Sequence, residues 1–322
     1  MKGRSILAAL AACMALLAAP AQAYLFSAVI SFGDSLSDTG TSGLMTPRPP
    51  LAPSPPYADG RFTNGPVATE VLAQGLGVPL KSYAVGGALS GVGNADVADT
   101  NSSPYFSGVV SQVAKYLTDS GGAADPNALY VVLGGSNDFL ALLPALDGAP
   151  QETVDALLTS TAATVITNLT AAVYTLYLAD ATQFLLPLLP DIGMAPAVSD
   201  LDVSAAIFGV NQTLNAAYLD LFAQLADPGV RFTIFDTFAA QTGLAIEFPD
   251  TVTPCLDATT GDVCSDPNSS FFWDDLHPTA HVHALLGAQL LAAVPEPGSM
   301  VLAGLALAGL ATSRRRQPAP WA

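Results

Sequence analysis

Five short apolar runs recur along the chain, and each is followed by a turn and then by a helix-like stretch. The runs lack alternation of apolar and polar residues, which is typical of strands buried on both faces of a parallel sheet. They span residues 28–32, 80–83, 129–133, 183–188 and 232–235. Strands that alternate with helices form βαβ units, so this order predicts an α/β fold with helices flanking the sheet.

The clearest helix is predicted over residues 153–180, where apolar residues recur at three- and four-residue steps. Further helices are predicted over residues 66–76, 107–117, 204–226 and 278–293. The last would have Pro278 at its first position, where a missing N–H removes no helical hydrogen bond. Two segments are predicted to be loops: 46–56, which holds six prolines in eleven residues, and 251–270.

The two ends of the chain differ from its middle. Residues 1–23 are typical of a secretory signal peptide, with two basic residues, an apolar run and a small-residue cleavage site. Residues 294–322 begin with Val294-Pro295-Glu296-Pro297 and continue in an apolar run that is followed by three arginines, residues 314–316. Residues 24–293 are left for the folded part, a length that fits one α/β domain.

Composition excludes two classes of protein. Hydrophobic residues make up 51% of the chain, so it can bury a large core, and intrinsic disorder is excluded. Between residues 24 and 296 there are 5 Lys and Arg against 27 Asp and Glu, which gives a net charge of −22. Such a charge repels phosphate, so we expect no nucleic-acid partner.

Cysteine is scarce. Cys255 and Cys264, nine positions apart in a chain with an export signal, either form a local disulfide, which we favour, or remain free thiols. Two thiols alone do not make a zinc site. Cys13 follows Leu10-Ala11-Ala12, which resembles a lipoprotein cleavage box, but the apolar stretch before it is short.

Polar residues at two places in the sequence form a pattern that suits nucleophilic catalysis, one after the first predicted strand and one in a loop before the last predicted helix. Gly33 permits a tight turn after the first strand that can present the Ser35 hydroxyl at the sheet edge. Near the end of the domain, Asp274 precedes His277 by three residues and can fix its tautomer, which leaves the other ring nitrogen as a general base. His277, His281 and His283 cluster in sequence, but no further ligands complete a metal shell, so we expect no metal.

Two further turns can supply donors for an oxyanion. Asn137 follows the third strand after two glycines, and its amide can donate a hydrogen bond without adding charge. Gly86 and Gly87 follow the second strand, and either can point a backbone N–H at the same place. Each motif alone is an ordinary turn, and only their combination and order indicate a hydrolase.

The combination resembles the GDSL esterase/lipase family, also called SGNH hydrolases. Residues 33–38, Gly-Asp-Ser-Leu-Ser-Asp, resemble its first block, with Ser35 as nucleophile. Gly87 resembles the glycine of the second block, with Gly86 as an adjacent rival. Asn137 lies in a likeness of the third block, and Asp274 and His277 match the Asp-x-x-His of the fifth.

The resemblance implies a three-layer α/β/α, flavodoxin-like sandwich with a five-stranded parallel sheet. It also implies hydrolysis of carboxylic esters through an acyl-enzyme at Ser35, with His277 as base and Asp274 as its partner. The oxyanion would be bound by Ser35, Gly87 and Asn137, and no cofactor would be needed. The substrate does not follow, because members of this family act on short acyl esters, phospholipids or acetylated sugars.

The C-terminal segment resembles a PEP-CTERM sorting signal of Gram-negative bacteria. This likeness implies an exosortase-type processing enzyme as a partner and a transient association with the inner membrane, after which the protein is periplasmic, surface-bound or extracellular. A permanent C-terminal anchor is the alternative. The signal also leaves open a non-catalytic protein associated with exopolysaccharide, or a deacetylase of acetylated polysaccharide.

Overall fold

The computed structural model describes residues 26–45, 52–98, 100–101, 105–198 and 203–294. The predicted signal peptide and nearly all of the segment 294–322 lie outside these residues. Five parallel strands form one sheet in the order β2-β1-β3-β4-β5. They are β1 (Val29–Phe32), β2 (Leu80–Ser82), β3 (Leu129–Val132), β4 (Gln183–Pro187) and β5 (Arg231–Phe235). The predicted α/β fold is confirmed, and the strand order is that of flavodoxin-like proteins.

The burial of the strands explains why they could be predicted from apolar runs in the sequence. Every residue of β1, β3 and β4 is buried, whereas the edge strands β2 and β5 are partly exposed. In the register, Ser31 of β1 pairs with Ser82 of β2 and with Val131 of β3. The carboxyl ends of these three strands therefore lie side by side, and the loops after them share one edge of the sheet.

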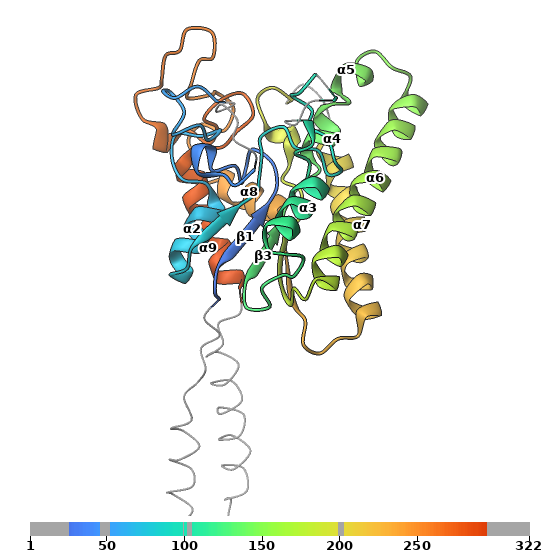
Figure 1. The fold of residues 1–322 in the computed structure, drawn as a ribbon. Helices are drawn as coiled ribbons and strands as arrows, with labels where there is room; N and C mark the ends of the chain where they lie inside the picture. The colour runs from blue at the N-terminus through green and yellow to red at the C-terminus, as the bar shows by residue number, and fades with distance from the viewer. Residues whose placement is uncertain (1–25, 46–51, 99, 102–104, 199–202, 295–322) are drawn as a thin grey trace, which may run out of the picture. The chain divides into compact units, whose positions relative to one another are not determined.

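Helices cover both faces of the sheet (Figure 1). On one face α2 (Ala68–Leu76) packs against α9 (Ala280–Ala293), and α9 also contacts α8 (Thr237–Ala245). On the other face α6 (Gln151–Leu178) lies between α3 (Val109–Asp119) and α7 (Ser204–Leu225). The shorter elements are α4 (Ser136–Leu140), α5 (Leu143–Leu146), η1 (Gly40–Ser42), η3 (Ile192–Met194) and η4 (Pro267–Ser269).

Helix α6 is, among the described residues, the one helix long and apolar enough to cross a membrane. Its contacts are those of a helix within the folded domain, because it packs between α3 and α7 in one helical layer. The buried residues Val165, Leu169, Ala172, Val173 and Leu176 recur at steps of one, three and four and make one packed stripe. We therefore assign α6 to the helical layer of the domain, with one buried face.

The predicted start of the last helix needs correction, and helices α4, α5 and α8 were not predicted. The last helix begins at Ala280, not at Pro278, because Pro278 forms a β-bridge with Phe272 and is still extended. Helix α8 was not among the predicted helices. It begins where the carboxylate of Asp236 accepts a hydrogen bond from the N–H of Ala239 (2.9 Å), a local N-cap directly after β5.

Candidate active site

The turn after β1 holds Ser35. Gly33 allows it, because a Cβ at this position would lie 3.0 Å from the carbonyl oxygen of Leu133. The buried side chain of Gln112 in α3 holds the turn through two hydrogen bonds to the backbone of Gly33. Its Oε1 accepts from the N–H of Gly33 (2.8 Å), and its Nε2 donates to the Gly33 carbonyl (2.7 Å). The serine side chain therefore projects from a turn that is hydrogen-bonded on both sides.

Three side chains from distant parts of the sequence meet here. The Oγ atom of Ser35 lies 2.9 Å from Nε2 of His277. On the other side of the ring, Nδ1 lies 2.9 Å from Oδ1 and 2.8 Å from Oδ2 of Asp274. An ionised carboxylate only accepts hydrogen bonds, so the ring proton is assigned to Nδ1 and Nε2 is left to accept the serine proton.

Backbone groups also hold the carboxylate of Asp274. Its Oδ1 accepts from the N–H of Leu276 (2.8 Å) and of His277 (2.6 Å). Burial opposes the charged form, but the hydrogen bond and charge of His277, together with these N–H groups, outweigh it. The pKa of Asp274 is therefore held below its ordinary value of 3.8, and Asp274 stays ionised at neutral pH.

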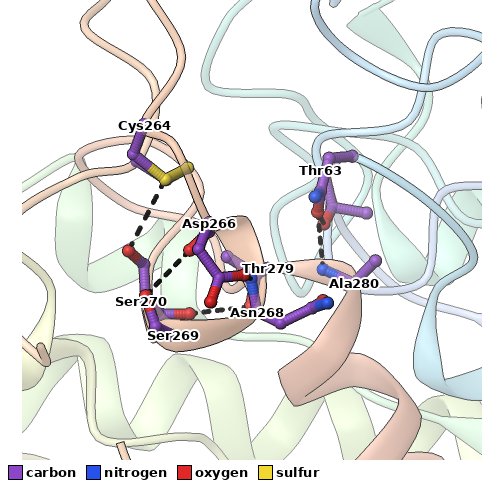
Figure 2. Close-up of a disulfide and its surroundings, with 10 residues drawn as sticks. Thr63, Cys264, Asp266, Asn268, Ser269, Ser270, Thr279 and Ala280 are labelled. Atoms are coloured by element: carbon purple, nitrogen blue, oxygen red, sulfur yellow. Dashed lines mark hydrogen bonds between the residues drawn. A yellow bond between two sulfur atoms is a disulfide. The ribbon is translucent and has the colours of Figure 1, made fainter. Parts of the chain in front are cut away.

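A disulfide between Cys255 and Cys264 braces the loop that leads to Asp274. Cys255 and Leu256 form a small buried cluster with Trp273, the residue before Asp274. Backbone hydrogen bonds join the two segments, from the Leu256 N–H to the Trp273 carbonyl (2.7 Å) among others. Figure 2 shows Cys264 of the bridge above the Ser270 hydroxyl.

The two glycines after β2 differ in their hydrogen bonds. The N–H of Gly86 donates to Oδ2 of Asp38 (2.7 Å) and is therefore not free to bind a substrate. Within the part of the chain that the structure describes, no oxygen accepts from the N–H of Gly87 or of Ser35. Gly87 has a φ of +73°, a conformation that glycine adopts at little cost. Of the two glycines, Gly87 is thus the one whose N–H lacks an acceptor within the described residues, and neither glycine lines the cavity beside Ser35.

Asn137 lies in the first turn of the short helix α4, directly after β3. One hydrogen of its side-chain amide goes to the carbonyl of Ala88 (3.0 Å), the residue after Gly87. This bond ties the turn after β3 to the turn after β2. Within the described residues the second amide hydrogen has no acceptor, and both Asn137 and Ser35 line the same cavity.

Asp34, beside the serine, is a buried carboxyl. Burial raises its pKa from 3.8 to about 6, although the nearby His277 acts in the opposite direction. Its Oδ1 accepts from the N–H of Leu36 (3.1 Å), whereas Oδ2 has no hydrogen-bond partner among the described residues. A carboxyl whose pKa is raised on folding stabilises the fold while it is protonated. This contribution is complete below pH 3.8 and is lost as the pH rises through about 6.

A cavity of about 90 Å³ adjoins Ser35 and His277. Most of its lining is apolar and includes Leu36, Leu140, Pro190, Ile192, Phe235 and Phe272. Phe272 lines it, whereas its two neighbours in the sequence do not. Phe271 and Trp273 are packed in the interior instead. The segment 46–51 of the proline-rich loop lies outside the described residues.

The side chains of the three histidines make different contacts. Only His277 reaches Ser35, whereas the His281 ring packs against Phe248 at 5.5 Å between centroids. His283 is buried and accepts a hydrogen bond at Nδ1 from the N–H of Ala68 (3.2 Å). Burial lowers its pKa to about 3, so it stays neutral. In the described residues no group of three His, Cys, Asp or Glu side chains could hold a metal ion.

Three residues that contact the site were given no role in the sequence analysis. Asp38 stands within the first motif, and its carboxylate also accepts from the N–H of Gly40 (2.8 Å). Phe62 packs its ring on His277 at 5.0 Å between centroids. Gln112 is an amide on a buried helix face, where a polar residue must find partners. A buried polar residue among apolar ones is the signal that could have singled out Gln112.

The sequence of the chain matches the family model of the GDSL-like lipase/acylhydrolases over residues 29–290. The chain belongs to the GDSL-like lipase/acylhydrolase family. A second model, that of the PEP-CTERM protein-sorting motif, matches residues 293–316. This motif indicates export in Gram-negative bacteria and processing by an exosortase.

Relatives of this GDSL-family protein include the thermolabile hemolysin of Vibrio parahaemolyticus, which is 28% identical over 82% of this chain and 62% of its own length. The phosphatidylcholine-sterol acyltransferase of Aeromonas hydrophila is 30% identical over 64% of this chain and 57% of its own length. The chain thus spans about three fifths of these two relatives. Among solved structures, an extracellular lipase from Streptomyces rimosus is similar with a TM-score of 0.45 and 17% identity, covering 84% of this chain and 100% of that one.

Proposed function

We propose that the protein is an exported serine hydrolase that cleaves carboxylic esters through an acyl-enzyme at Ser35. The observation that carries this proposal is the hydrogen-bonded series from Ser35 to His277 to Asp274, with distances of 2.9 Å and 2.8 Å. Such a series activates a hydroxyl that is otherwise a weak nucleophile. Membership of the GDSL-like family supports the same reaction.

The reaction proceeds in two halves. The Oγ atom of Ser35 attacks the ester carbonyl carbon while its proton passes to Nε2 of His277, and Asp274 stabilises the imidazolium. The tetrahedral intermediate expels the alcohol, which takes the proton from His277. Water then attacks the acyl-enzyme with His277 as base again, which releases the acid and restores Ser35.

Three donors stabilise the negative oxygen of the tetrahedral intermediates. They are the backbone N–H groups of Ser35 and Gly87 and the second hydrogen of the Asn137 amide. The first two make no hydrogen bond within the described chain, and the third is oriented by the Ala88 carbonyl. Donors fixed before reaction need no reorganisation when the charge develops, which makes them effective catalysts.

The properties of the cavity favour esters with a short acyl group as substrates. It is lined mainly by apolar side chains, which suit an acyl chain better than a sugar, and its volume is about 90 Å³. The two relatives' names refer to hemolysis and to phosphatidylcholine, so phospholipids are the competing substrate. A charge of −22 over residues 24–296 disfavours binding to anionic lipid surfaces.

A series of esters tests this proposal. With the full chain we expect kcat/KM for p-nitrophenyl butyrate to exceed that for the palmitate ester by at least about tenfold, because a cavity of about 90 Å³ encloses a short acyl chain more completely than a long one. Acyl release from phosphatidylcholine vesicles and acetate release from acetylated exopolysaccharide are measured beside it. Preference for palmitate or for phosphatidylcholine would contradict the short-acyl assignment, faster acetate release from the polysaccharide would favour a deacetylase, and no turnover of any substrate would favour a binding protein.

A further inference from the structure

Tyr57 directly follows the proline-rich loop 46–56 and reaches the site. Its hydroxyl donates a hydrogen bond to Oδ2 of Asp274 at 2.7 Å, across a separation of 217 residues in the sequence. The Tyr57 ring also packs edge-on against Trp273, with 6.2 Å between centroids. Tyr57 therefore contacts both Asp274 and the residue that precedes it.

The hydroxyl of Tyr57 completes the set of donors around the carboxylate. Nδ1 of His277 lies near both oxygens of Asp274. Oδ1 also accepts from two backbone N–H groups, whereas Tyr57 is the one further donor to Oδ2 among the described residues. Burial, and then the charge of Asp274, raise the pKa of Tyr57 above its ordinary value of 10. The hydroxyl thus stays protonated, and toward the carboxylate it acts only as a donor.

The loop around Tyr57 is fastened to the loop of Asp274 and His277 at further points. The hydroxyl of Thr63 donates to the carbonyl of Pro278 (2.8 Å), and Oδ1 of Asn64 accepts from the N–H of Ala280 (2.7 Å). Tyr57 itself packs against the cluster of Cys255, Leu256 and Trp273. Its position is therefore set by both loops.

We propose that Tyr57 is a positioning residue that holds Asp274 in line with His277 and shares the charge of its carboxylate. This inference rests on the proposed ester hydrolysis at Ser35. Without the hydroxyl, Oδ2 carries more negative charge and binds the protonated ring of His277 more strongly. The carboxylate also loses one of the bonds that fix its rotation, and small misplacements near the reacting atoms reduce rates strongly.

The test is the variant Tyr57→Phe, which keeps the ring against Trp273 and removes only the hydroxyl. For p-nitrophenyl acetate we expect kcat to fall about tenfold with KM nearly unchanged. The acid limb of the kcat/KM profile should move to higher pH by about half a unit, since the protonated imidazole is stabilised. The other ionisable groups that act on this site, Asp34, Asp275 and His283, are the same in both proteins.

Tyr83→Phe is the matched control. The Tyr83 hydroxyl donates to Oδ2 of Asp119 at 3.1 Å, so this variant also loses one tyrosine-to-aspartate hydrogen bond, but not at Asp274. We expect its pH profile and kcat to match those of the unmodified protein. The inference is overturned if Tyr57→Phe keeps kcat within about twofold and an unshifted profile, or if both variants lose activity equally. An unmodified protein without esterase activity overturns the proposed function instead, which distinguishes the two failures.

Discussion

Replacement of Ser35 by alanine is expected to lower kcat for p-nitrophenyl acetate by at least about 10⁴-fold. The reason is that the acyl-enzyme cannot form without the Oγ atom that lies 2.9 Å from His277. His277→Ala should cause a loss of similar size, because His277 is the one base that binds Oγ among the described residues. The double variant should lose little more than either single variant, since the two residues act as a unit. Steady-state kinetics measures all three.

Matched controls separate loss of chemistry from loss of fold. Ser31→Ala removes another buried serine hydroxyl, on β1, which has no hydrogen-bond partner in the described residues. His281→Ala removes a histidine of α9 that packs against Phe248 rather than the site. Both should keep activity, and circular dichroism should show all variants folded. A folded Ser35→Ala protein that retains more than about 1% of kcat would contradict the assignment.

Asn137→Ala should give the second-largest effect, a fall in kcat of about 10² to 10³. The amide stabilises charge that develops on the carbonyl oxygen after attack, so it acts in the transition state more than on bound ester. KM should therefore change little. The measurement is kcat and KM for p-nitrophenyl acetate, and a raised KM with unchanged kcat would contradict the role of an oxyanion donor.

Asn211→Ala provides the control for Asn137. The Asn211 side chain is also buried, and it binds the N–H (2.9 Å) and the carbonyl (2.8 Å) of Leu189. Removing it should lower thermal stability, because two buried backbone groups lose their partners. A loss of kcat in this variant comparable to that of Asn137→Ala would indicate a general effect of loosened loops rather than an oxyanion role.

The sheet could be predicted because parallel strands that are buried on both faces consist of consecutive apolar residues, which can be recognised in a single sequence. All five strands begin and end within one residue of the predicted runs. The edge strand β5 begins one residue earlier than predicted, at Arg231, because backbone pairing with Gln183 of β4 does not require an apolar side chain. Helix α8 was missed because its capping by Asp236 is a local contact that apolar periodicity does not report.

The site was accessible to prediction where its parts are close in sequence or follow strands. Asp274 and His277 are three residues apart, and Ser35 and Asn137 follow neighbouring strands, so the sheet edge brings them together. Contacts across long separations leave no such pattern. The hydrogen bond from Tyr57 to Asp274 is of this kind. Likewise, Gly86 and Gly87 differ in whether their N–H donates to the carboxylate of Asp38, and the sequence does not show which of them does.

Labelling with a fluorophosphonate probe tests the central claim, a nucleophilic Ser35, most directly. The probe reacts covalently with an activated serine, so peptide mapping by mass spectrometry identifies the residue that carries it. We expect one modified site, on the peptide that contains Ser35, complete loss of ester turnover on labelling, and no labelling of Ser35→Ala. Modification of another residue, or ester turnover that persists while Ser35 is fully labelled, would contradict the account.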